Sequence, residues 1–104
     1  MISRHWTGIA RREFADRYVN HLEHETFPEL ASLPGFIRAT VLRRELATGT
    51  EFQVVTLWDS LSSIEAFAGV DVDAAVVPLE VQAMMVNYDR SVAHYEIADV
   101  FPAE

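Results

Sequence analysis

The segment from Val54 to Ser60 constrains the fold of this chain more than any other. Its β-branched residues end at Trp58, and an acid and a serine follow before apolar residues recur at Ile64 and Phe67. A β-branched run is typical of a strand, and apolar residues three positions apart are typical of a helix. The segment therefore predicts a strand that enters a helix, with a large aromatic side chain at the junction.

This strand has a second informative property, which is that both of its faces are largely apolar in the middle. An antiparallel sheet with one solvated face normally alternates apolar and polar residues. Here the residues of the two faces are Phe52, Val54, Thr56 and Trp58 on one side and Gln53, Val55 and Leu57 on the other. We therefore expect helices to cover one face and a partner subunit to cover the other, which predicts a homodimer.

The remaining elements follow from periodicity and from turn residues. Pro28 falls within a helical stripe and should kink that helix or restart it. Ser62 and Glu65 match a capping box, and Gly69 is suited to end the following helix. We expect strands over 2–9, 36–46, 51–59 and 90–100, and helices over about 11–33, from Ser60 or Ser62 to Gly69, over 71–77 and over 78–86.

The order of these elements predicts the fold class. Strand, helix, two strands, short helices and a last strand should form an α+β fold, with a ferredoxin-like four-stranded antiparallel sheet and helices on one of its faces. The length of 104 residues fits one domain over residues 1–104. No stretch is apolar enough to span a membrane, and no signal peptide is expected.

Composition excludes several functions. The net charge is −8, which disfavours nucleic acids and anionic membrane surfaces as partners because both require a basic face. Cysteine is absent, which excludes disulfides and thiolate metal sites and fits a cytoplasmic location. All basic side chains are arginines, so Schiff-base chemistry on a lysine is also excluded.

Four pieces of the chain carry a resemblance to a known family. They are Arg4-His5-Trp6, the turn Leu33-Pro34-Gly35-Phe36, the segment Thr56-Leu57-Trp58-Asp59-Ser60 through Ala66-Phe67, and His94-Tyr95-Glu96. With these pieces and its element order, the chain resembles the antibiotic biosynthesis monooxygenase family of dimeric α+β barrel proteins. The resemblance implies a dimer in which two four-stranded sheets pack together, with a pocket between sheet and helices in each subunit.

The resemblance also implies two kinds of activity. Some members oxidise polycyclic aromatic molecules to quinones without metal or flavin, and Trp58 matches their pocket tryptophan. Their asparagine, tyrosine and arginine correspond to Val54, Ile64 and Pro78, which offer no equivalent groups. Other members degrade haem with an asparagine, a tryptophan and a histidine. The matching positions here are Trp6 or Thr7, Phe67 and Val77, so haem degradation is not expected.

Five residues are candidates for the site. We expect Trp6, Trp58, Ile64 and Phe67 to contact a small apolar or aromatic substrate, although Trp58 could equally be a core aromatic whose N–H meets a backbone carbonyl. His94 is the candidate general base, because its ordinary pKa lies near neutrality. The alternative for His94 is a structural histidine that is hydrogen-bonded across the sheet or the dimer interface.

The sequence offers one set of residues with the spacing of metal ligands. His21, His24 and Glu25 have the spacing of ligands on a helix. However, His24 lies almost opposite the apolar stripe, and no third or fourth ligand is evident, so we expect a solvated face and no metal or cofactor. Two functions remain open, a cofactor-independent monooxygenase and a non-catalytic dimer that binds a small ligand or serves as an interaction module.

Overall fold

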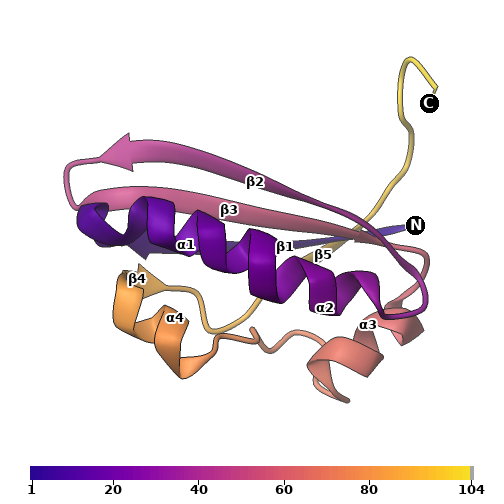
Figure 1. Ribbon diagram of the computed structural model, residues 1–104. Coiled ribbons are helices and arrows are strands. Elements are labelled where there is room, and N and C mark those ends of the chain that lie inside the picture. The colour runs from indigo at the N-terminus through magenta and orange to yellow at the C-terminus, as the bar shows by residue number, and fades with distance from the viewer. Residues whose placement is uncertain (104) are drawn as a thin grey trace.

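The computed structural model describes residues 1–103, which form an antiparallel sheet with helices packed against it (Figure 1). The strand order is β2-β3-β1-β4, and β5 also pairs with β1. The strands are β1 (Ile2–Ala10), β2 (Phe36–Leu46), β3 (Gly49–Trp58), β4 (Met85–Tyr88) and β5 (Ala93–Glu96). The α+β class and the ferredoxin-like arrangement predicted from the sequence are confirmed.

The first helical run follows β1 and crosses one face of the sheet. It comprises η1 (Arg12–Phe14, a 3₁₀ turn), α1 (Ala15–His21), η2 (Leu22–Thr26, a π-helical segment) and α2 (Phe27–Ala31). Pro28 has no N–H with which to bond the carbonyl of His24, and the N–H of Phe27 bonds Leu22 O, five residues back. The interruption expected at Pro28 is therefore present, and it takes the form of a wider helical turn just before the proline.

Helix α3 (Leu61–Ala68) follows β3 directly, as the strand-to-helix pattern predicted. Its cap is Ser60, whose Oγ accepts from the backbone N–H of Ser63 at 3.3 Å, so the capping box predicted for Ser62 and Glu65 is not the one formed. Gly69 ends the helix with a φ of 83°, a conformation that favours glycine.

The region after α3 differs from the prediction. Residues 71–77 are not helical, α4 covers only Leu79–Met84, and the chain then enters β4. The expected last strand over 90–100 is reduced to β5. Strand β4 pairs with Gly8–Ala10 and β5 pairs with Ile2–His5, so the two short strands share the fourth position in the sheet. Apolar runs this short are compatible with either helix or strand, and pairing to β1 decided between them.

Burial differs between the two faces of the sheet. On the helix side Phe52, Thr56 and Trp58 are buried, whereas on the other side Leu42 is 52% exposed and Tyr95 is 57% exposed. The core forms two clusters, one around Tyr18, Leu22, Phe52 and Met84 and one around Leu30, Trp58 and Ile64. Among the described residues, no helix has the length and apolar character needed to cross a membrane.

Candidate functional site

A cavity of about 310 Å³ lies between the sheet and the helices. Its floor comes from β1 and β3, and its walls come from the first helical run, α3, α4 and the segment that precedes α4. The lining residues include Arg4, Trp6, Val54 and Thr56 of the sheet and Tyr18, Leu22, Thr26, Glu29, Phe67, Val77, Pro78 and Val81 of the other elements. Most of these side chains are apolar, which is usual for a small-molecule site.

Arg4 places a guanidinium group in this apolar wall. The residue is only 5% exposed. Its Nη1 donates to Val72 O and to His94 Nε2 (3.0 Å), and its Nη2 donates to Ala74 O at 2.9 Å. Burial lowers the pKa of Arg4, and the nearby charge of Asp73 opposes that shift. An arginine remains charged in proteins and has five N–H donors, three of which make these bonds to described residues.

His94 lies beside Arg4 on the neighbouring strand, with its ring held from both sides. Its Nδ1 is 3.1 Å from an oxygen of Asp73, and its Nε2 accepts from Arg4. Since arginine can only donate, Nε2 must be unprotonated and Nδ1 must carry the proton. The lone pair that a general base would use is thus occupied by Arg4. This geometry suits the alternative stated for His94, a histidine hydrogen-bonded across the sheet, better than it suits a base.

The structure brings two of the four predicted substrate-binding residues to the cavity. Trp6 and Phe67 line it, whereas Trp58 and Ile64 are fully buried in the core and do not. The indole N–H of Trp58 donates to Thr56 Oγ1 at 2.9 Å, and its ring stacks on Phe67 with centroids 6.3 Å apart. Trp58 therefore supports the cavity wall from behind rather than forming its surface.

Trp6 is held in one orientation across the strand. Its Nε1 donates to Asp89 O at 2.8 Å, and its ring lies where a Cβ on Gly8 would be. Gly8 therefore gives the indole room to lie flat against β1. Tyr18 packs at 6.3 Å from this indole and at 5.0 Å from Phe52, and burial raises the pKa of the Tyr18 hydroxyl, which stays protonated.

Arg4 is the functional candidate that reasoning from sequence missed. It was noted only as part of a family resemblance, although it shares a strand face with Trp6. The sequence did contain a signal, because Arg4 is a charged residue on a strand face that is otherwise largely apolar. A charge in such a position can be buried only if it finds hydrogen-bond partners. Those partners lie 68 to 90 residues away along the chain, in a loop and a strand whose positions could not be foreseen.

The histidines considered as metal ligands are separated by the structure. His24 turns away from His21, with its Nδ1 3.0 Å from Asn20 O. His21 points inward and its Nδ1 is 2.7 Å from Glu25 Oε2. Of the three residues that the helical spacing suggested as ligands, only His21 and Glu25 therefore lie in contact.

The fold and cavity define a class of small α+β domain that encloses a small-molecule cavity between one sheet face and its helices. The family model described as antibiotic biosynthesis monooxygenase matches residues 2–71. The chain belongs to the antibiotic biosynthesis monooxygenase family.

Solved structures share the fold at low sequence identity. A protein from Bacillus cereus, provisionally described as an antibiotic biosynthesis monooxygenase, is 18% identical with a TM-score of 0.66, over 99% of this chain and 96% of that chain. A Deinococcus radiodurans protein with the same provisional description is 16% identical with a TM-score of 0.65, over 100% of this chain and 99% of that chain. A mutant of MhuD, solved with two manganese protoporphyrin IX molecules per active site, is 18% identical with a TM-score of 0.66, over 96% and 98%. No curated protein matches the chain.

Proposed function

We propose that this protein is a homodimeric, cofactor-independent monooxygenase that acts on a small aromatic molecule bearing an acidic oxygen, such as an enol or a phenol. The observation that carries the proposal is the Arg4 guanidinium in an otherwise largely apolar cavity wall. A cation at such a place favours a ligand that is apolar over most of its surface and anionic at one oxygen.

The chemistry needs little from the protein beyond this arrangement. A substrate with a CH₂ group next to the conjugated system loses a proton to solvent, and the negative charge moves to the oxygen that Arg4 contacts. The carbanion form gives an electron to dioxygen, a C–O bond forms, and the peroxide loses water as the O–O bond breaks. The CH₂ carbon becomes a carbonyl carbon, one oxygen atom enters the product, and the other leaves as water.

The protein's residues bind and orient the substrate for these steps. Arg4 lowers the pKa of the bound acid by stabilising its anion, which is the electrostatic term expected to dominate. Trp6 and Phe67 present aromatic surface to the rings. The cavity volume of about 310 Å³ is at the lower end of the range for ligand sites, roughly 300–1,000 Å³, which favours a substrate of only a few rings.

The proposed dimer would cover the sheet face that the helices leave open. Leu42, Val86 and Tyr95 expose apolar surface. A second copy packed there would bury this surface, and a stable interface is expected to exceed roughly 1,200 Å² in total. Light scattering at micromolar concentration should give twice the chain mass, and Leu42→Glu should shift the protein toward monomer. A monomer mass for the unaltered chain would end this part of the proposal.

The second candidate function is a non-catalytic dimer that binds a ligand of the same chemistry. Two observations favour it. The lone pair of His94 is occupied by Arg4, and no histidine is present among the described residues that line the cavity. The two functions differ in one measurement, which is consumption of dioxygen in the presence of a bound ligand.

Haem degradation is not proposed. The positions that would carry it are Trp6 or Thr7, Phe67 and Val77. MhuD shares the fold with this chain, and its bound porphyrins are a property of that protein. Incubation with haem and a reductant should leave the Soret band decaying at the rate seen without protein. Stoichiometric formation of a ring-opened product would overturn this expectation.

The central experiment compares Arg4→Gln with Arg44→Gln. Arg44 is the control, because its side chain is 70% exposed and does not line the cavity. Quenching of tryptophan fluorescence by a panel of tricyclic enols and phenols measures binding, and an oxygen electrode measures turnover. Arg4→Gln should weaken binding of the anionic ligand by about 10- to 100-fold, because a charge-assisted hydrogen bond is lost. Arg44→Gln should bind as the unaltered chain does. Equal binding by all three proteins would remove Arg4 from the site.

A further inference from the structure

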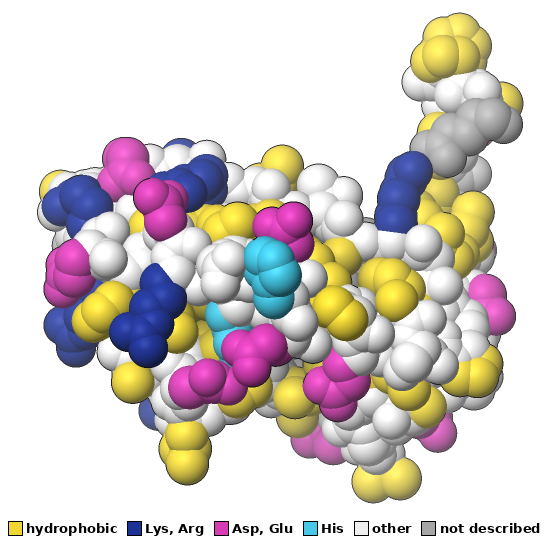
Figure 2. All heavy atoms as spheres, viewed as in Figure 1, with side chains coloured by type: hydrophobic (Ala, Val, Ile, Leu, Met, Phe, Trp, Pro, Cys, Tyr) yellow, Lys and Arg dark blue, Asp and Glu magenta, His cyan; other side chains and the backbone are white. Residues whose placement is uncertain are grey.

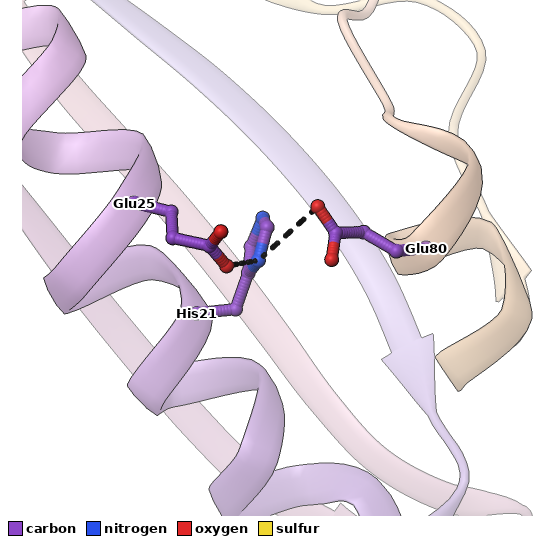
Figure 3. Close-up of side chains that lie close together, drawn as sticks. All are labelled: His21, Glu25 and Glu80. Atoms are coloured by element: carbon purple, nitrogen blue, oxygen red, sulfur yellow. Dashed lines mark hydrogen bonds and ion pairs between the residues drawn. The ribbon is translucent and has the colours of Figure 1, made fainter.

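Three potential metal ligands, two from the first helical run and one from α4, converge outside the cavity lining (Figure 3). His21 ends α1, Glu25 lies one turn later in η2, and Glu80 lies on α4. His21 Nδ1 is 2.7 Å from Glu25 Oε2 and 3.8 Å from Glu80 Oε1. One ligand atom from each residue lies within 4.8 Å of the others.

Figure 3 shows both carboxylates directed at the same edge of the imidazole ring, one from each side. Figure 2 shows acidic side chains gathered beside histidines on this helix-bearing face. The sequence offered His21 and Glu25 four residues apart, but the third ligand comes from an element 55 positions further along the chain. That third ligand is what the sequence lacked for a metal site.

The charges at this cluster are not balanced by the protein. A neutral imidazole and two carboxylates carry a local charge of about −2. Among the described residues, the ion pairs recorded for Glu25 and Glu80 are with His21 alone. Protonated His21 would cancel one charge, whereas a divalent cation would cancel both and would remove the repulsion between the carboxylates.

The ligands combine one fixed group with two adjustable ones. The side chain of His21 is 6% exposed, so packing holds its ring in place. The side chains of Glu25 and Glu80 are 63% and 58% exposed and are able to move. Ligand atoms about 2.0–2.2 Å from a zinc ion lie roughly 3.3–3.6 Å apart in a tetrahedron. To reach that geometry, the 2.7 Å contact with Glu25 would widen by roughly 0.6–0.9 Å and the 3.8 Å contact with Glu80 would shorten by roughly 0.2–0.5 Å.

We propose that His21 Nδ1, Glu25 and Glu80 form a binding site for a divalent first-row transition-metal cation such as Zn²⁺, with water completing the coordination. One imidazole nitrogen and two carboxylate oxygens form a ligand set that suits Zn²⁺, Mn²⁺ or Co²⁺. The cation binds His21 Nδ1 in place of the hydrogen bond to Glu25, and the single proton of the neutral imidazole is then carried on Nε2.

The bound cation would join α4 to the first helical run. Leu22, next to His21, and Val81, next to Glu80, both line the cavity, so the metal would hold two of its walls together. This role is independent of the proposed oxidation, because the site lies outside the cavity lining and takes no part in the chemistry.

The experiment titrates the chelator-treated full chain with ZnCl₂ by calorimetry and with CoCl₂ by visible absorption. One Zn²⁺ per chain should bind, and Co²⁺ should give the visible bands of a low-coordinate site. Glu80→Gln should weaken Zn²⁺ binding at least tenfold, and His24→Ala and Glu23→Gln, two exposed neighbours, should leave it unchanged. Zn²⁺ should also raise the thermal midpoint of the unaltered chain, but not that of Glu80→Gln.

Two results would overturn the proposal. One is a chelator-treated chain that binds no Zn²⁺ at up to about 1 mM, an affinity too weak to matter. The other is Zn²⁺ binding that Glu80→Gln and Glu25→Gln leave unchanged, or that His24→Ala abolishes. Glu80→Gln is chosen first because its side chain is exposed and its loss should not affect folding, which circular dichroism would check.

Discussion

Two histidines of this protein, whose side chains are 6% and 10% exposed, have opposite surroundings. His94 lies between the cation of Arg4 and the carboxylate of Asp73, whereas His21 lies between two carboxylates. The first ring has both nitrogens engaged by groups of opposite charge, so its local charge is balanced. The second faces excess negative charge. The two side chains are about equally enclosed, so their partners, rather than their burial, distinguish the structural link at His94 from the metal ligand proposed at His21.

The largest effect is expected from breaking the balanced site. Arg4→Leu would leave Val72 O, Ala74 O and His94 Nε2 without their donor. Three part-buried acceptors would lose a charged donor together, so the free energy of unfolding should fall by about 3 kcal/mol. The urea midpoint, measured at fixed protein concentration, checks this. A change under about 1 kcal/mol would show that the network contributes little.

His94→Gln and His94→Ala sharpen the role of that histidine. Glutamine keeps an oxygen that can accept from Arg4, whereas alanine does not. If His94 positions Arg4, His94→Gln should retain most turnover and His94→Ala should chiefly raise KM by weakening ligand binding. If His94 is a general base, both variants should lower kcat by about 10² or more. His24→Ala serves as the control on an exposed histidine.

Gly8→Ala tests how firmly the cavity wall is held. A methyl group there would overlap the ring of Trp6, which must then leave its place against β1. We expect ligand affinity to fall about tenfold and stability to fall by about 1–3 kcal/mol, as in overpacked sites. Ligand titration and urea unfolding measure the two effects. Unchanged tryptophan emission and affinity would show that Trp6 is not required in this position.

A third histidine provides a pH test. Burial lowers the pKa of His5. A histidine whose pKa is lower in the folded state contributes stability above its unfolded pKa of about 6.5, and this contribution is lost as pH falls through the folded value. The urea midpoint should therefore decline as pH falls below about 6.5, and His5→Gln should reduce that decline. The same slope in both proteins would exclude His5 as a source.

The smallest effect is expected at the cluster of like charges. Without metal, Glu80→Gln removes one carboxylate from beside Glu25 and His21, so repulsion should fall. The free energy of unfolding should stay the same or rise by less than about 0.5 kcal/mol, because both glutamates are exposed. Urea unfolding in the presence of a chelator measures this. A marked loss of stability would mean that Glu80 stabilises the surroundings of His21, and the contrast with the charge-balanced surroundings of His94 would then be smaller than proposed.

Local sequence was sufficient for the first two thirds of the chain. The β-branched run, Trp58 and the serines predicted the junction of β3 and α3, and Gly69 ended the helix where a positive φ was needed. These features are decided within a few residues of the chain, by rotamer preference, capping and turn geometry. The matching family model over residues 2–71 covers the same region.

Tertiary structure decided the rest. Residues 71–100 carry short apolar runs without a clear period, and their conformation depends on which of them pair with β1. The sites depend on the same long-range packing, because Arg4 meets His94 and His21 meets Glu80 only after distant elements come together. Sequence spacing determines which residues share one helix or strand face. The approach of a second element determines whether their charges are balanced, and therefore what chemistry they can perform.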